Sequence, residues 1–176
     1  FERETYFITD RNGAVIDLQW GLSLNMLPFD LGIDHIREHQ MTVYSGGQEL
    51  TTFRLEDLLL YLCAHGSRHC WERLGWVADV AGLINLHPQL DWDVVLLQAR
   101  RLRCERVLLH GLLLAKDLMG ANLPPAIEQL AQSDEKSREC TDRILQALAQ
   151  PLGWSMNQLD LHRYYLKLQD RRADQL

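Results

Sequence analysis

A stripe of apolar residues that begins at Leu55 most strongly constrains the fold of this chain. Apolar side chains recur there at intervals of three and four, which is the spacing of one helix face (Leu55, Leu58, Leu59, Leu62 and Cys63). Helical patterns continue to about residue 171, with stop signals at Pro88, Gly120 and the pair Pro124 and Pro125. Residues 51–176 are therefore predicted to form a helical lobe of about six helices.

Two of these helices have sequences that predict more than their position in the chain. The helix expected from about Trp71 to Leu86 is apolar nearly all round, so we expect it to be central in the lobe. The next helix begins with Asp91-Trp92-Asp93, which has the form of a metal-binding Asp-x-Asp pair. Because this motif follows a proline and opens a helix, we expect Asp91 to be the N-cap and not a metal ligand.

Extended structure is expected before the lobe. Two β-rich runs within residues 3–20 lie on either side of Asn12-Gly13, the strongest short signal for a β-hairpin. An isolated hairpin is marginal in water, so it must pack on helices or on strands outside this chain. A second extended pair is expected around Gly46 and Gly47. The fold class is thus α+β and predominantly α, divided into residues 1–50 and residues 51–176.

Composition restricts the classes of function. The chain has 47% hydrophobic and 24% charged residues, as a globular protein does, and its net charge of −6 disfavours a protein that coats nucleic acid. The most basic segment is expected to be a solvated helix face (Arg100, Arg101, Arg103 and Arg106). Four cysteines without a CxxC pattern are typical of reduced thiols in a cytoplasmic protein. No run reaches the ~18 apolar residues of a membrane span.

Residues 62–84 concentrate polar and aromatic side chains in an otherwise apolar stretch. His65 and His69 lie one turn apart and share a helix face, as two zinc ligands would. A zinc site needs a third ligand, and Gly66 stands where an HExxH metalloprotease has its glutamate. We favour a structural role, in which Asp79 is buried and pairs with a histidine or arginine of the preceding helix. The alternative is that a histidine contacts a phosphate or a base.

Asp17 is the most informative single residue. It lies between Ile16 and Leu18 in a β-rich run, where an acid is intrinsically disfavoured. Taken alone, such a carboxylate either faces water at a sheet edge or forms part of a site.

Three longer segments bear on this choice: VIDLQWGLS, LEDLLLYLCAHGSRHCWERLGWVADVAGLI and LDWDVVLLQARRLRCERVLLHGLLLAKDLMGANLPP. In the order and spacing of their motifs they resemble the uncharacterised nucleotidyltransferases, a distant branch of the polymerase-β-type superfamily. The resemblance covers about residues 14–125, although Gln19 stands where the family more often has histidine. The motif positions are Asp17 with Trp20, His65 and His69 with Trp71, Trp76 with Asp79, and Asp91 with Trp92.

This resemblance implies a small mixed sheet whose three acids hold two Mg²⁺ ions, followed by a helical lobe. It implies transfer of a nucleoside monophosphate from an NTP to a hydroxyl or phosphate acceptor. Asp17 matches the third acid and would be a catalytic residue and a Mg²⁺ ligand. His65, His69 and Asp79 would line or brace the nucleotide cleft.

The first two acids of the family follow a Gly-Ser or Gly-Gly turn as an Asp-x-Asp pair. Here Gly46-Gly47 comes after Asp17, and no such pair follows it at the right distance. The chain, which begins at Phe1, is therefore expected to be a C-terminal fragment that binds no Mg²⁺ or NTP tightly and is inactive alone. The competing prediction is a non-catalytic helical interaction module, whose hairpin offers an edge to a partner strand.

Overall fold

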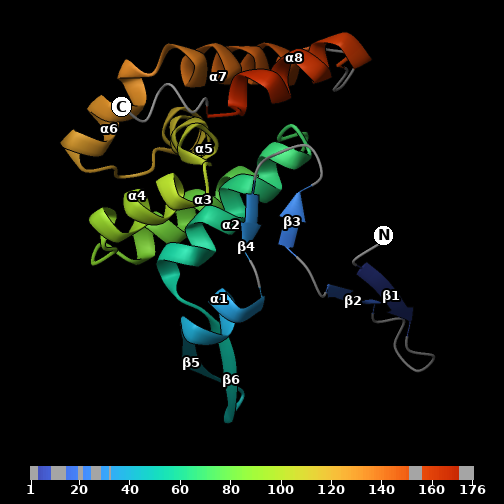
Figure 1. The fold of residues 1–176 in the computed structure, drawn as a ribbon, viewed down its shortest axis with the longest axis vertical. Helices are drawn as coiled ribbons and strands as arrows, with labels where there is room; N and C mark the ends of the chain where they lie inside the picture. Colours follow the sequence, from blue (N-terminus) through green and yellow to red (C-terminus); the bar gives the residue numbers. More distant parts are fainter. Residues whose placement is uncertain are drawn as a thin grey trace.

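The computed structural model describes the backbone of residues 4–8, 15–19, 22–24, 29–31, 33–150 and 156–170. Within the last two of these ranges it also describes the side chains of residue 35 and of all residues from 37 onward. It is α+β and mostly helical, as predicted, with the strands on the N-terminal side (Figure 1). The strands are β1 (Glu4–Ile8), β2 (Val15–Gln19), β3 (Leu22–Leu24), β4 (Phe29–Leu31), β5 (Gln40–Ser45) and β6 (Gln48–Phe53). The helices are α1 (Ile33–Glu38), α2 (Leu55–Arg68), α3 (Leu74–Leu86), α4 (Trp92–Arg101), α5 (Glu105–Met119), α6 (Pro125–Ser133), α7 (Glu135–Leu148) and α8 (Gln158–Leu168).

The described strands pair as antiparallel hairpins, β1 with β2, β3 with β4 and β5 with β6. The first pair confirms the hairpin expected within residues 3–20, although its Asn12-Gly13 turn lies outside the described residues. The β5–β6 pair confirms the second extended pair. Its turn residues Gly46 and Gly47 have φ of 58° and 77°, the positive values that a type I′ hairpin turn requires at both central positions.

The central helix of the lobe is α5, and the prediction that the helix ending at Leu86 is central is wrong. Helix α5 is buried along most of its length and packs against α2, α3, α6 and α7 (Figure 1). Helix α3 buries Val77 and Val80 but exposes Ala78 and Asp79, and Leu86 is 77% exposed. Small residues on its outer face made α3 look apolar all round without placing that face in the core.

Helix α3 also begins later than predicted, at Leu74, because the chain changes direction after α2. Cys70 and Trp71 have φ of 50° and 56°, a left-handed conformation that ends one helix and delays the next. The reversal turns the Trp71 side chain inward, where it is fully buried. A Cβ on Gly66 would lie 2.4 Å from the Trp71 ring, and one on Gly111 would lie 3.2 Å from it. The two glycines therefore allow α2 and α5 to approach the indole closely.

A buried polar network joins α5 to α7 and α8. His110 is fully buried, with Nδ1 2.9 Å from Thr141 Oγ1 and Nε2 3.0 Å from the hydroxyl of Tyr164. The Thr141 hydroxyl donates to the carbonyl of Ser137, so it accepts from Nδ1–H, and Nε2 accepts from Tyr164. His110 is therefore a neutral histidine, and its burial lowers its pKa from 6.5 to about 3.

This depressed pKa predicts acid sensitivity. Between pH 6.5 and 3 the unfolded chain protonates His110 and the folded chain does not, so stability is present above pH 6.5 and is lost as the pH falls. From pH 7 to pH 5 this group alone is expected to lower the free energy of unfolding by about 2 kcal/mol. Urea denaturation at both pH values measures the change. The His110→Gln variant should show a shallower pH dependence, and an unchanged slope would exclude this cause.

Predicted helix ends agree with the structure at α4 and α5. The Asp91 side chain accepts a hydrogen bond from Val94 N at 3.1 Å, so it is the N-cap of α4, as expected. Gly120 adopts the left-handed conformation at the end of α5. The backbone N–H groups of Glu105 and Arg106 at the start of α5 donate to the Asp170 carboxylate, which ties the residues after α8 to the central helix.

Candidate functional site: a histidine–tryptophan cluster

His65 and His69 lie on one face of α2, as their spacing predicts, with ring centroids 4.9 Å apart. Trp76 of α3 packs against both, with centroid distances of 5.5 Å to His65 and 4.9 Å to His69. All three side chains are half-buried, so each keeps surface that a ligand can contact. We call these three residues the histidine–tryptophan cluster.

Further side chains extend the cluster in both directions. Tyr61, one turn before His65, lies 5.8 Å from its ring, and Phe53 of β6 stacks on Tyr61 at 5.8 Å. The guanidinium of Arg73 lies 5.7 Å from the centroid of the Trp76 ring. The sequence prediction did not include Tyr61, although its spacing of four from His65 places both residues on one helix face.

The cluster belongs to the part of the lobe that adjoins the strands. Helix α2 contacts both β3 and β6, and β3 lies near α2 in Figure 1. Aromatic faces can stack on a base, imidazole N–H groups can donate to phosphate oxygens, and a guanidinium supplies positive charge. This combination of groups suits a nucleotide.

Asp79 does not make the buried pair that was predicted for it. It is exposed on α3, and the described side chains provide no hydrogen bond or ion pair to it. The prediction failed because it assumed that α3 is buried on every side, whereas an exposed aspartate is solvated by water and needs no partner. Its suggested role at a nucleotide cleft stays a prediction.

Asp17 lies in the middle of β2, directly opposite Tyr6 of β1 in the hairpin register. Its side chain lies outside the described residues, so its role as a catalytic Mg²⁺ ligand also stays a prediction.

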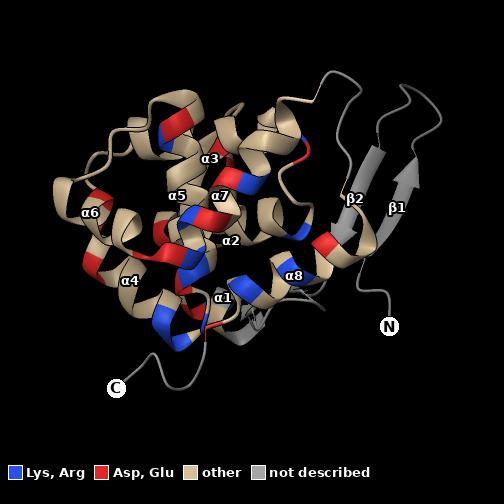
Figure 2. Ribbon diagram, turned by 90° about the horizontal axis from the view of Figure 1, so that it is seen from above, with Lys and Arg blue, Asp and Glu red and all other residues tan. Residues whose placement is uncertain are grey.

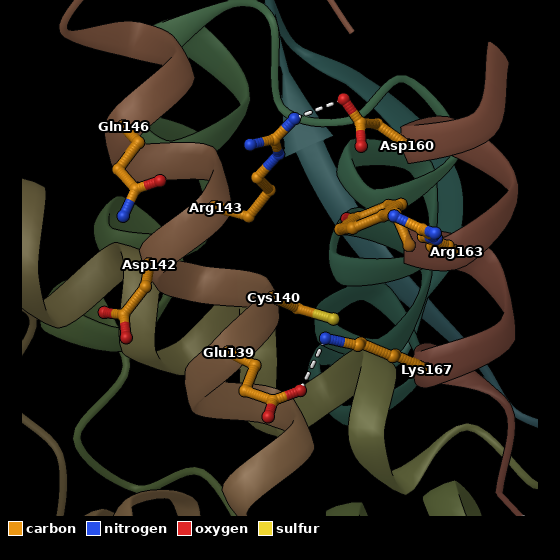
Figure 3. Close-up of a pocket in the computed structure, with 9 residues that line it drawn as sticks. Glu139, Cys140, Asp142, Arg143, Gln146, Asp160, Arg163 and Lys167 are labelled. Atoms are coloured by element: carbon orange, nitrogen blue, oxygen red, sulfur yellow. Dashed lines mark hydrogen bonds and ion pairs between the residues drawn. The ribbon is translucent and has the colours of Figure 1, made fainter. Parts of the chain in front are cut away.

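A pocket with a volume of about 430 Å³ lies between α7 and α8 (Figure 3). Cations and anions from the two helices pair across it, Arg143 with Asp160 and Lys167 with Glu139. The thiol of Cys140 is not a ready nucleophile, because burial raises its pKa to about 12. With its charges largely paired, this pocket offers less to an anionic nucleotide than the histidine–tryptophan cluster does.

The described helices carry no long basic stripe, and Figure 2 shows acidic and basic segments mixed along them. In the arginine-rich segment, Arg100 pairs with Glu105 at 3.0 Å, while Arg106 is buried and donates to the Gln169 carbonyl at 2.7 Å. The expectation of one solvated basic face is therefore wrong for Arg106. Within the described part of the chain, none of the helices has the length and apolar character needed to cross a membrane.

Comparison with known proteins gives one result. A family model described as "uncharacterised nucleotidyltransferase" matches residues 1–120, which contain Asp17 and the whole histidine–tryptophan cluster. No curated protein and no solved structure gives a significant match. Since the matched region is well over half of the 176 residues, the chain belongs to the family of uncharacterised nucleotidyltransferases.

Proposed function

We propose that the protein transfers a nucleoside monophosphate from an NTP to a hydroxyl or phosphate acceptor, and that this chain supplies part of the nucleotide site. The observation that carries the proposal is the family match over residues 1–120. The histidine–tryptophan cluster supports it, because it provides stacking surfaces and hydrogen-bond donors within the matched region.

In this proposal Asp17 holds Mg²⁺. A carboxylate is a hard oxygen donor of the kind that Mg²⁺ prefers, so the residue type fits the ion. One carboxylate supplies only part of the ligand set that Mg²⁺ needs, so other acidic residues, water and the triphosphate would supply the rest. When bound, Mg²⁺ neutralises triphosphate charge and orients the phosphates.

The cluster recognises the nucleotide. Trp76 offers an indole face to the base, and stacking on an aromatic residue contributes about 1–3 kcal/mol per base. His65 and His69 donate N–H groups toward the phosphates, with Arg73 beside them as a positive charge. Asp79 borders this surface from α3 and would contact the ribose or a bound cation.

Substitution within the cluster tests nucleotide recognition. In the full-length protein, Trp76→Ala and His69→Ala are each expected to raise the Kd for a Mg²⁺–NTP complex by about tenfold, since each removes roughly 1.4 kcal/mol of contact. Isothermal titration with each of the four NTPs measures the effect. The matched control is His162→Ala, which removes an exposed histidine of α8.

The control is expected to bind like the wild type. Equal affinities in all three variants would remove the cluster from the nucleotide site. A lower thermal stability of His69→Ala together with normal binding would assign the cluster a purely structural role.

A non-catalytic interaction module remains the second candidate, and the β5–β6 hairpin favours it. Among the described strands this hairpin is a two-stranded sheet whose outer edges pair with no further strand, and it exposes Tyr44 (75%) and Leu50 (47%). Tyr44→Ser with Leu50→Ser should abolish binding to a partner protein in this case. Nucleotide-dependent activity that survives the double substitution would speak for the enzyme.

A further inference from the structure

A second group of histidines lies outside the histidine–tryptophan cluster. His35 belongs to α1, His39 follows α1, and Asp57 lies in the first turn of α2. His35 Nε2 is 3.0 Å from Asp57 Oδ1, and one potential ligand atom from each of the three residues lies within 4.8 Å of the other two. The Asp57 side chain is only 5% exposed and that of His35 is 19% exposed.

The β5–β6 hairpin creates this proximity. Its two-residue turn at Gly46 and Gly47 fixes the register, so that Gln40 pairs with Phe53. The ladder continues one step further, with Arg54 N donating to the carbonyl of His39 at 3.1 Å. The residues that enter the hairpin therefore meet the first turn of α2, which brings His35 beside a carboxylate 22 positions later.

A hydrogen bond to the backbone orients the ring of His39. His39 Nδ1 lies 2.9 Å from the backbone carbonyl of His35, and a carbonyl can only accept. Nδ1 therefore carries the proton, and Nε2 keeps its lone pair. Metal-binding histidines commonly donate their second ring N–H to a backbone carbonyl in this way, which fixes both tautomer and ring orientation.

We propose that His35, His39 and Asp57 bind one Zn²⁺ ion, with a fourth position open to water. Two imidazoles and one carboxylate form a mixed nitrogen and oxygen set that suits Zn²⁺, whereas Mg²⁺ prefers oxygen donors alone. Ligand bonds of about 2.0–2.1 Å place the donor atoms of a tetrahedral site roughly 3.3 Å apart. His35 Nε2 and Asp57 Oδ1, which share a hydrogen bond of 3.0 Å, already lie near this separation, and the donor atom of His39 lies within 4.8 Å of both.

This site is separate from the proposed nucleotide site. Asp57 precedes His65 by eight residues on α2, which is about 12 Å along the helix axis. Zinc bound there fastens α1 and the start of the β5–β6 hairpin to the helical lobe. The ion would stabilise this junction whether or not the protein transfers nucleotides.

Zinc titration of metal-free full-length protein tests the proposal. Isothermal titration is expected to give one equivalent of Zn²⁺, and Co²⁺ in its place should give the visible absorption of a low-symmetry, four- to five-coordinate site. His39→Ala and Asp57→Asn are each expected to weaken Zn²⁺ binding at least tenfold. Saturating Zn²⁺ should raise the Tm of the wild type and leave that of His39→Ala nearly unchanged.

Two control variants locate the ion. His69→Ala removes the other pair of histidines one turn apart, and His162→Ala removes an exposed histidine of α8; both should bind Zn²⁺ as the wild type does. His39→Gln provides a second test if the alanine variant does not fold. Wild-type protein without saturable binding, or binding lost in His69→Ala but kept in His39→Ala, would overturn the proposal. None of these readouts depends on nucleotide transfer.

Discussion

Replacing Trp71 by alanine is expected to lower the free energy of unfolding by about 3–5 kcal/mol. The indole is fully buried where α2 and α5 approach each other, and Gly66 and Gly111 leave no room for other atoms around it. His110 packs edge-on against the ring, with a centroid distance of 6.0 Å. Alanine would leave a cavity at the centre of the lobe that these rigid helices cannot close.

The indole contributes through packing, because its buried Nε1 has no hydrogen-bond partner among the described residues. Trp71→Phe should therefore cost less than the alanine variant. Gly66→Ala should destabilise by about 1–3 kcal/mol, since its new methyl group would overlap the ring. Urea denaturation followed by circular dichroism measures all three variants.

The matched control is Trp92→Ala at the start of α4, where the side chain is only half-buried. Its cost should be clearly smaller than that of Trp71→Ala. If the two tryptophan variants were equally stable, Trp71 would not be the centre of the core.

Much of the lobe could be predicted because its signals are local. The apolar spacing from Leu55 predicts α2, and Asp91 and Gly120 mark helix ends that the structure confirms. The position of α3 could not be predicted in the same way. Its apolar composition arises partly from small residues on an exposed face, and its start is delayed by the left-handed backbone at Trp71.

In the candidate sites, contacts within one helix could likewise be predicted, whereas contacts between elements could not. His65 and His69 share a face because they are four residues apart on one helix, and this spacing can be read from the sequence. The contact with Trp76 depends on how α3 packs against α2, which the sequence does not specify. The expectation for Asp79 was wrong for the same reason, because the exposed face of α3 could not be identified from the sequence. The proximity of His35 to Asp57 depends on hairpin register, which requires pairing Gln40 with Phe53 across the turn.

Asp17→Asn is expected to have the largest effect on activity. Asparagine keeps the size of the side chain but removes the negative charge that we propose binds Mg²⁺, and metal stabilisation of phosphoryl chemistry amounts to several kcal/mol. Pyrophosphate release should therefore fall by about 100-fold or more. Stability should change little, because residue size and the β1–β2 pairing are retained.

The control for this prediction is Asp93→Asn. Asp93 is exposed in the first turn of α4 and belongs to the Asp91-Trp92-Asp93 sequence, which the structure explains by helix capping. Its activity should equal that of the wild type. A large loss of activity in the Asp93 variant would place the metal-binding acids in α4.

Mg²⁺-dependent release of pyrophosphate from NTP by the full-length protein, compared between wild type and Asp17→Asn at equal folded concentration, tests the proposed function most directly. The nucleotidyltransferase account predicts release by the wild type and a loss of about 100-fold or more in the variant, with matching thermal melts. Equal turnover by the two proteins, or a variant that fails only because it unfolds, would contradict the assignment of Asp17 as the metal-binding acid.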